Sequence, residues 1–395
     1  MSPSAQPPAA TPALDGLQVW MVGGAVRDTL LGLPVTDRDW VVIGASAQEM
    51  SERGFTPVGK DFPVFLHPQT REEYALARTE RKNGHGYKGF LIHASPAVTL
   101  EQDLARRDLT INALAAPPGW TGDAAHVIDP HGGLADLRQR RLRHITPAFS
   151  EDPVRILRLA RFAARLPHFH IASATLALLR QMVSQGEAAH LVPERVWQEL
   201  SRGLMQTAPH RMIDALHASR ALAAALPEIR YQPALLARLQ TAARLQAPLP
   251  VRYACLAWPA PQAHLTSLAT RLRPPADCHD LARLLTRLHP AIAQAHTLPA
   301  AALLELLQQA DALRRPERFA QLLLAAQCTA DEPGTPAELP PWPPARRLLT
   351  ALAAAQSVPT AAIARQTAAT GGPSAIAQAI HAARLQAITQ ALPAP

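Results

Sequence analysis

Hydrophobic and polar positions follow two different patterns along the 395-residue chain. Up to about residue 148, short apolar runs alternate with clusters of glycine and aspartate, which is typical of strands joined by turns. Beyond that point, alanine, leucine, arginine and glutamine recur at helical spacing between proline breaks. These patterns predict an α+β fold, in which a mixed or antiparallel sheet with helices is followed by helices alone. The expected strands cover residues 17–22, 40–43, 62–66, 73–79 and 126–129.

The changes of pattern also divide the chain into segments. Glu151-Asp152-Pro153 has the acidic residues and the early proline of a helix start, so a helical neck is expected to begin nearby. A proline-rich stretch at 332–344 marks another boundary. The expected segments are a disordered Pro/Ala-rich N-terminal tail (1–16), a head (17–148), a helical neck (149–208), a helical body (209–330) and a helical C-terminal tail (331–395).

The stretch from Val19 to Gly44 carries the strongest candidate chemistry. Its first strand ends at Gly23-Gly24, where the backbone can turn sharply because no Cβ obstructs an incoming group. Residues 25–31 then have the pattern of a short helix, whose first free N–H groups lie beside the glycines. Such a turn binds anions and is suited to a triphosphate. By itself a Gly-Gly turn is weak evidence.

Two aspartates follow before the next apolar strand. Asp37 and Asp39 are two residues apart, and on an extended chain such side chains point to the same side. They can therefore share divalent cations, and Mg²⁺ in proteins is commonly held by one or two carboxylates together with substrate phosphates. Two metal ions held in this way activate an attacking hydroxyl and stabilise the leaving group. An Asp-x-Asp pair alone more often marks a solvated loop.

The order strand, Gly-Gly, helix, Asp-x-Asp, strand is more specific than either motif, and it lacks the lysine of a P-loop and the third glycine of a dinucleotide fold. It resembles the signature of the polymerase-beta-like nucleotidyltransferase superfamily. Within it, the chain resembles the class II tRNA nucleotidyltransferases, which are the CCA-adding enzymes, and the bacterial poly(A) polymerases. The resemblance runs in family order over roughly the first half of the chain, through residues 19–44, 60–65, 73–80, 106–113, 151–158 and 193–197.

This resemblance implies an enzyme that adds CCA to the 3′ end of tRNA from CTP and ATP without a nucleic-acid template, releasing pyrophosphate. The head would be the catalytic domain, the neck would select the nucleotide and the C-terminal tail would bind tRNA. Asp37 and Asp39 would be the catalytic residues and would hold Mg²⁺. Gly24, Arg27 and Arg107 would bind the triphosphate.

The resemblance also assigns the rest of the nucleotide pocket. Asp108 would contact the ribose, Asp152 and Arg155 would read the base edge, and Arg158 and Arg161 would complete the pocket. The arginines recur every three or four residues and so share one helix face. On pattern alone this could be a plain solvated face, but the phosphate site upstream favours the functional interpretation. Base selection by side chains is physically sufficient, because a buried polar group left unpaired by the wrong base costs about 1–3 kcal/mol.

Charge and cysteine content narrow the partners and the setting. The chain has 39 Lys and Arg against 31 Asp and Glu, a formal charge of +8, which favours a polyanionic partner such as tRNA. Its three cysteines form no Cys-x-x-Cys pair, as expected of a cytoplasmic protein, and no apolar run is long enough for a membrane span.

The glycine-rich stretch 78–89 is expected to be either a surface loop or a flap that closes on the substrate. The pattern leaves a monomer and a dimer open.

Two other functions stay open at this stage. A bacterial poly(A) polymerase would use the same chemistry with ATP only. A non-catalytic tRNA-binding protein on this scaffold is disfavoured, because every charged position that the chemistry requires is filled.

The second half departs from many proteobacterial relatives, which carry a metal-dependent phosphohydrolase domain of the His-Asp type. Their His-Asp pair lies in a context similar to residues 251–256, where this chain continues with Ala257-Trp258-Pro259 instead. A later His279-Asp280 has no partner histidines at ligand spacing. The sequence therefore indicates that no functional phosphohydrolase site is present.

We accordingly predict that the protein does not hydrolyse 2′,3′-cyclic phosphates in the presence of Ni²⁺ or Mg²⁺. The measurement is phosphodiesterase turnover by a preparation that is active in nucleotide addition. Clear turnover would show that another set of ligands replaces the missing pair.

Overall fold

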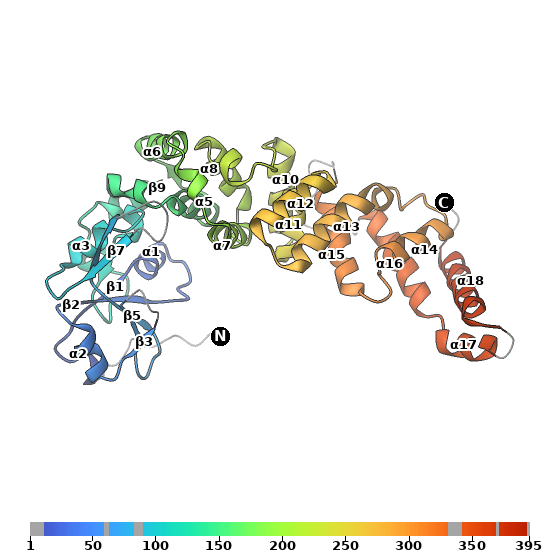
Figure 1. The fold of residues 1–395 in the computed structure, drawn as a ribbon, viewed down its shortest axis with the longest axis horizontal. Helices are drawn as coiled ribbons and strands as arrows, with labels where there is room; N and C mark the ends of the chain where they lie inside the picture. The colour runs from blue at the N-terminus through green and yellow to red at the C-terminus, as the bar shows by residue number, and fades with distance from the viewer. Residues whose placement is uncertain (1–11, 59–62, 83–89, 331–341, 369–370, 393–395) are drawn as a thin grey trace. The chain divides into compact units, whose positions relative to one another are not determined.

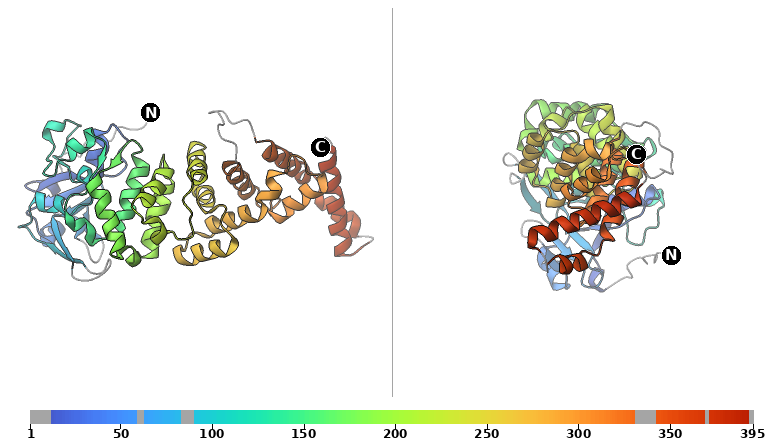
Figure 2. Two further views of the ribbon diagram at one scale, coloured as in Figure 1. Left: turned by 90° about the horizontal axis from the view of Figure 1, so that it is seen from above. Right: turned by 90° about the vertical axis from the view of Figure 1, so that its right-hand side faces the viewer.

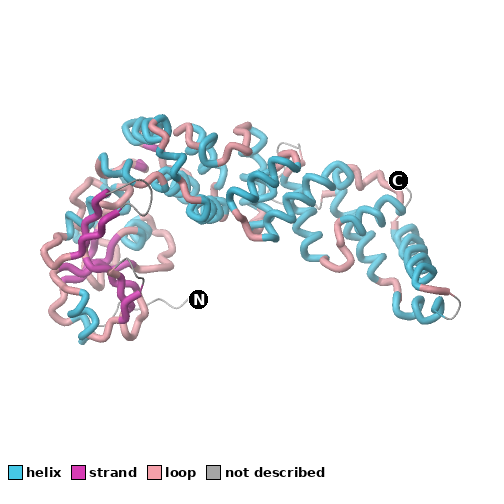
Figure 3. Tube along the Cα trace, viewed as in Figure 1, coloured by secondary structure: helices cyan, strands magenta, loops and turns pink. Residues whose placement is uncertain are grey.

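The structure is a computed structural model and describes residues 12–58, 63–82, 90–330, 342–368 and 371–392. The chain divides into two compact units. The first contains Met1–Val192 and Asp214–Ala225, and the second contains Pro193–Ile213 and Leu226–Pro395. Both the division and the described strands agree with the predicted α+β class, since strands lie in the first unit while helices continue through the second (Figure 3).

The first unit is built on a mixed sheet of strand order β3-β4-β5-β2-β1-β8 (Figure 1). Strands β1 and β2 pair antiparallel, β2 and β5 pair parallel, and the other neighbours are antiparallel. A separate hairpin consists of β6 and β7. The bounds are β1 Gln18–Val22, β2 Asp39–Ile43, β3 Thr56–Val58, β4 Val64–Leu66, β5 Glu73–Leu76, β6 Arg78–Lys82, β7 Phe90–Ala94 and β8 Ala115–Ala116.

Both faces of this sheet are buried, because side chains alternate across each strand. On one face Val22 and Val41 pack against Leu104 of α3 (Leu100–Ala105). On the other face Trp40 stacks on Tyr74, with ring centroids 5.6 Å apart. The apolar runs that predicted these strands therefore supply buried side chains on both faces of the sheet.

The predicted strand at 126–129 is wrong. Residues Ala124–His126 form a 3₁₀ turn, and Ile128 makes only an isolated bridge with Ala115. The chain leaves the sheet at once because the carboxylate of Asp129 accepts hydrogen bonds from the backbone N–H groups of Gly133 and Leu134 at the start of α4. In the stretch 78–89, residues 78–82 belong to β6 instead of a loop, and 83–89 lie outside the described residues.

Short helices complete the first unit. The bounds are α1 Gly24–Leu30, α2 Ala47–Glu52, α4 Gly133–Arg138, α5 Val154–Arg165, α6 Ser173–Ser184 and α9 Leu222–Ala225, with 3₁₀ turns η3 Thr110–Asn112 and η5 Pro147–Glu151 and a small parallel pair β9 Arg141–Leu142 and β10 His170–Ile171. The boundary between the two units crosses helix α8, Pro209–Ala218. Its residues up to Ile213 belong to the second unit, and those from Asp214 belong to the first.

In its described residues, the second unit is built of helices that pack against one another (Figure 2). Helix α11 lies at its centre, packed by α10, α13 and α15, and its Tyr253 is fully buried. The bounds are α7 Pro193–Leu204, α10 Pro233–Arg244, α11 Leu249–Ala257, α12 Gln262–Leu272, α13 Ala276–Ala293, α14 Ala300–Gln309, α15 Pro316–Cys328, α16 Pro343–Gln356, α17 Thr360–Ala368 and α18 Pro373–Ala391.

Residues 251–256, the segment that resembles the context of the His-Asp pair, contain an arginine with a structural role. Arg252 is buried and donates hydrogen bonds to the carbonyl oxygens of Ala247, Leu204 and Gln206. It thereby ties the end of α7 to α11. Within the described ranges, no helix combines the length and the apolar character needed to cross a bilayer. The five expected segments remain a prediction.

Gly133 allows α4 to approach η3 closely. A Cβ at this position would lie well within van der Waals contact distance of the Thr110 carbonyl oxygen and 2.9 Å from Cδ2 of Leu114. Both neighbours are buried and cannot move easily.

We predict that Gly133→Ala destabilises the protein by about 1–3 kcal/mol, the range found for overpacked cores, although alanine favours helices. Thermal unfolding followed by circular dichroism measures the change. Gly372→Ala is the control, because its Cβ would meet no atom within 4 Å and its φ of −83° suits any residue. Equal melting temperatures for the two variants would contradict the close approach.

Candidate active site

The glycine turn and the second aspartate are brought together by the register of two strands. In the antiparallel pair of β1 and β2, Val22 lies opposite Asp39, so Asp39 is next to Gly23. Gly23 has φ +72° and ψ −125°, a conformation that residues other than glycine rarely adopt. An ideal Cβ on Gly23 would lie 2.9 Å from Nη1 of Arg107. The turn therefore gives room to the Arg107 guanidinium.

Asp37 and Asp39 lie on one side of their segment. The two residues that alternate with them, Arg38 and Trp40, both reach Glu72: Nη1 of Arg38 is 3.5 Å from Oε1, and Nε1 of Trp40 donates to Oε2 at 3.0 Å. Because side chains alternate on extended backbone, Asp37 and Asp39 point the other way. Asp37 precedes β2 and Asp39 is its first residue, and both are exposed.

The electrostatics of Asp39 show that its neighbours are close. Crowding by surrounding protein atoms raises the pKa of Asp39, although its carboxylate stays open to solvent. The positive charge of Arg107 lowers this pKa and the negative charge of Asp37 raises it further. In the described part of the chain, no cluster of three or more His, Cys, Asp and Glu residues is suited to a metal. A cation at the Asp37–Asp39 pair would relieve their repulsion and take its other ligands from substrate phosphates.

Arg107 is held in place from behind by Asp103. The Asp103 carboxylate is fully buried and accepts hydrogen bonds from Arg106, from Nη2 of Arg107 at 3.2 Å and from the backbone N–H of Arg78. Burial alone would raise the pKa of Asp103, but Arg106 and Arg107 outweigh it and the pKa is lowered. Nε of Arg107 is buried and has no hydrogen-bond partner among the described residues. The atom of Arg107 that lies next to the glycine turn is Nη1.

Asp108 lies behind this turn in a buried network. Its carboxylate accepts from Nε of Arg158 at 2.8 Å, from the amide of Asn112 at 2.9 Å and from the backbone N–H of Leu109 at 2.8 Å. Burial opposes ionisation, but Arg158 and these hydrogen bonds dominate, so the pKa of Asp108 lies far below its usual range. The network therefore stabilises the charged form of Asp108.

Arg27 is buried, whereas Gly24 beside it is partly open. The guanidinium of Arg27 donates to both oxygens of Asp28 at 2.9 Å and to Oδ1 of Asn112, and it lies 5.1 Å from the centre of the Phe162 ring. Burial lowers the pKa of Arg27, and Asp28 opposes the shift. Its predicted contact with a triphosphate remains a prediction, since the protein already uses these donors.

Helix α5 places the remaining predicted residues along one side of the first unit. Asp152 accepts from the backbone N–H of Val154 at the helix start. Arg155 donates to the carbonyl oxygens of Ala148 and Arg106, and Arg161 lies 4.7 Å from the ring centre of Phe162. All of these side chains are partly exposed.

Several residues that organise this site were not among the predicted site residues. They are Asp28, Asp103, Asn112, Phe162 and Arg165. Asp28, Asn112 and Arg165 lie inside the quoted motifs or on the arginine face, so their positions were a usable signal. Asp103 and Phe162 carry no signal beyond helical spacing.

Comparison with known proteins agrees with this geometry. Residues 19–143 match the family described as the Poly A polymerase head domain, and residues 168–232 match one described as the probable RNA and SrmB-binding site of polymerase A. The chain is 50% identical to the multifunctional CCA protein of Acidovorax sp. strain JS42, over 96% of this chain and 98% of that one. It is 52% identical to the CCA-adding enzyme of Bordetella bronchiseptica, over 95% and 98% respectively. The chain belongs to the CCA-adding tRNA nucleotidyltransferase family.

Solved structures of the family share its fold. The apo form II of a CCA-adding enzyme covers 94% of this chain and 88% of its own, with a TM-score of 0.72 and 20% identity. The Thermotoga maritima CCA-adding enzyme complexed with tRNA covers 95% and 88%, with a TM-score of 0.67 and 19% identity. As a member of this family, the chain is a nucleotidyltransferase that adds CCA to tRNA, and the family implies use of a divalent metal ion.

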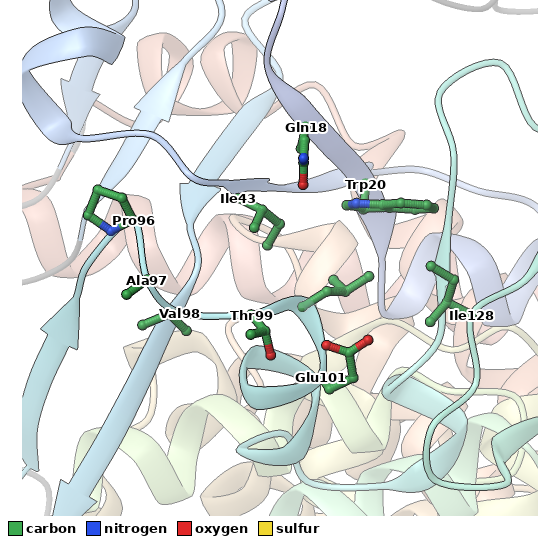
Figure 4. A pocket seen from close by; sticks show the side chains of 10 residues that line it. Gln18, Trp20, Ile43, Pro96, Ala97, Val98, Thr99, Glu101 and Ile128 are labelled. Carbon is green, nitrogen blue, oxygen red and sulfur yellow. The ribbon is translucent and has the colours of Figure 1, made fainter.

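A pocket of about 330 Å³ lies away from this site (Figure 4). Its walls include Gln18 and Trp20 of β1, Ile43 at the end of β2, and Glu101. Gln18 is five residues before Gly23, about 16 Å along an extended strand. We assign this pocket no part in nucleotidyl transfer.

We predict that Gly23→Ala lowers kcat/KM for nucleotide addition by at least about 10²-fold, the scale for loss of an important electrostatic group, because the new Cβ displaces Arg107. Steady-state incorporation of labelled nucleotide measures the loss. Gly16→Ala is the matched control, since Gly16 has a similar φ of +76° but its Cβ would meet nothing within 4 Å. A similar loss in both variants would indicate backbone strain instead of displacement of Arg107.

Proposed function

We propose that this chain adds C, C and A to the 3′ end of tRNA from CTP and ATP, with Asp37 and Asp39 as ligands of Mg²⁺. The observation that carries the proposal is the grouping of the two aspartates with Arg107 around the turn at Gly23. Bound there with substrate phosphates, divalent ions would lower the pKa of the attacking hydroxyl and neutralise charge on the leaving pyrophosphate.

The residues of the chain have separate tasks in this proposal. Gly24 and the start of α1 offer backbone N–H groups to the triphosphate, and Nη1 of Arg107, next to Gly23, supplies a charged donor. Asp108 contacts the ribose at the edge of its buried network. Arg27 and Asp28 support the turn from inside, so the phosphate site is formed before the nucleotide arrives.

Base selection is assigned to α5. Asp152 and Arg155 present acceptors and donors to the edge of the base, while Arg158 and Arg161 complete the pocket. Two carbonyl oxygens hold the Arg155 guanidinium, and the Phe149 ring centre is 5.9 Å from it. A side chain fixed in this way can discriminate between bases, because a mismatched edge leaves its remaining donors unpaired.

The proposed partners follow from the same chemistry. A formal charge of +8 favours tRNA as a polyanion, and a related enzyme has been solved with tRNA bound. The rival activity, poly(A) synthesis, is disfavoured because the similar proteins are a multifunctional CCA protein and a CCA-adding enzyme. A cytoplasmic location and the choice between monomer and dimer stay predictions.

The proposal is tested with tRNA lacking CCA, incubated with CTP, ATP or both. We expect addition to stop after three nucleotides when both are present, which gel analysis resolves. Unlimited addition of A from ATP alone would instead identify a poly(A) polymerase.

Asp37→Ala and Asp39→Ala should each lower the rate of addition by at least about 10²-fold, with little change in tRNA affinity. The matched control is Asp15→Ala, which removes an exposed carboxylate that precedes β1. Wild-type rates in either of the first two variants would rule out the metal ligands proposed here.

A further inference from the structure

Two arginines on one face of helix α5 bind buried carboxylates elsewhere in the first unit. Nε of Arg158 donates to Asp108 at 2.8 Å, and Nη2 of Arg165 donates to Oδ2 of Asp28 at 2.8 Å. These arginines are seven residues apart, which places them two turns apart on the same helix face. Arg165 is the last residue of α5, at the opposite end from the proposed base-reading residues.

The attachment at Arg165 connects α5 directly to the helix of the glycine turn. Asp28 lies in α1, which begins at Gly24, and it also holds Arg27 through both of its oxygens. The Asp28 side chain is only 8% exposed, so its bond with Arg165 is weakly screened by water. Phe162 lies between Arg158 and Arg165 in sequence, and the Arg27 guanidinium lies over its ring.

We propose that Arg165 is a positioning residue for nucleotide selection. A nucleotide must reach from the triphosphate site at the start of α1 to the base-reading residues at the start of α5. Arg165 fixes the relative placement of these two helices, so it sets the distance and angle that the nucleotide must span. This inference rests on the function proposed above.

Losing Arg165 would loosen the C-terminal end of α5. The helix would stay docked through the bond between Arg158 and Asp108, the bond from Arg155 to the Arg106 carbonyl oxygen and its buried apolar face, so the expected change is a small shift of that end relative to α1. A displacement of about 1 Å in a reacting geometry can cost as much as 10²-fold in rate. Incorrect bases already fit poorly, so they have less to lose than correct ones.

Two simpler roles predict different results. If Arg165 only added positive charge near the triphosphate, its loss would weaken all four nucleotides equally, because each carries the same phosphates. If it only stabilised the fold, its loss would lower the melting temperature and leave the ratio between correct and incorrect nucleotides unchanged.

The test compares Arg165→Gln with the wild-type protein in single-nucleotide addition. ATP and GTP are measured on tRNA that ends in CC, and CTP and UTP on tRNA that lacks CCA. We expect the ratio of kcat/KM for the correct over the incorrect nucleotide to fall by about 10-fold, within the range that misplacement can cause. The KM for tRNA should stay within about twofold, since Arg165 is directed at Asp28.

Two further variants complete the experiment. Arg165→Lys keeps a cation that can reach Asp28 and should restore most of the discrimination. Arg53→Gln is the matched control, because Arg53 is similarly exposed and pairs with Glu49 on α2 at 3.0 Å. It should leave the ratio unchanged.

Unchanged discrimination in Arg165→Gln would overturn the inference, whether or not its melting temperature falls, and so would an equal loss for all four nucleotides. Failure of the wild-type protein to complete CCA would instead contradict the proposed function. The two failures are therefore distinguishable.

Discussion

Two buried carboxylates, Asp28 and Asp108, hold the site together. Each is almost hidden from solvent, and an unpaired buried charge costs several kcal/mol. Their outer partners, Arg165 and Arg158, come from α5, which lies 137 and 50 residues further along the chain respectively. The docking of α5 therefore completes the hydrogen-bonding of both carboxylates. Each carboxylate also has partners outside α5, since Asp28 binds Arg27 and Asp108 binds Asn112 and the backbone N–H of Leu109.

This constraint explains how the arginine-rich face of α5 is used. Arg158 and Arg165 bind carboxylates, and Arg155 binds two backbone carbonyls. A face that the pattern left open as either solvated or functional is thus largely a docking face. Arg155 and Arg158 also remain partly exposed, so the contacts that dock the helix can orient guanidinium groups toward a nucleotide. In the proposed function, one set of side chains would serve both docking and substrate recognition, because Arg offers several donors in a fixed plane.

The sequence predicted what depends on local spacing. The strand before the glycines, the short helix after them and the shared side of Asp37 and Asp39 follow from periodicity, and the structure agrees with them. The roles of Asp28 and Asp103 did not follow, because their partners are set by tertiary packing. The predicted strand at 126–129 failed for a local reason, since the Asp129 side chain caps α4 and ends the extended backbone.

Arg27 and Arg107 differ in how their guanidinium groups are bound. Both belong to the resemblance, yet Arg27 is 4% exposed with its guanidinium bound to Asp28 and Asn112, while Nη1 of Arg107 lies at the turn. Freeing Arg27 to bind a phosphate would leave Asp28 with Arg165 alone and would sacrifice buried bonds worth about 1.5–3 kcal/mol each. Arg107 also binds a buried carboxylate, Asp103, through Nη2, but its Nη1 is the atom nearest to a Cβ built on Gly23. In the proposed function, Arg107 would therefore contact the triphosphate directly and Arg27 would hold α1 and contribute the field of its charge in a region of low dielectric, while a direct contact from Arg27 stays a prediction.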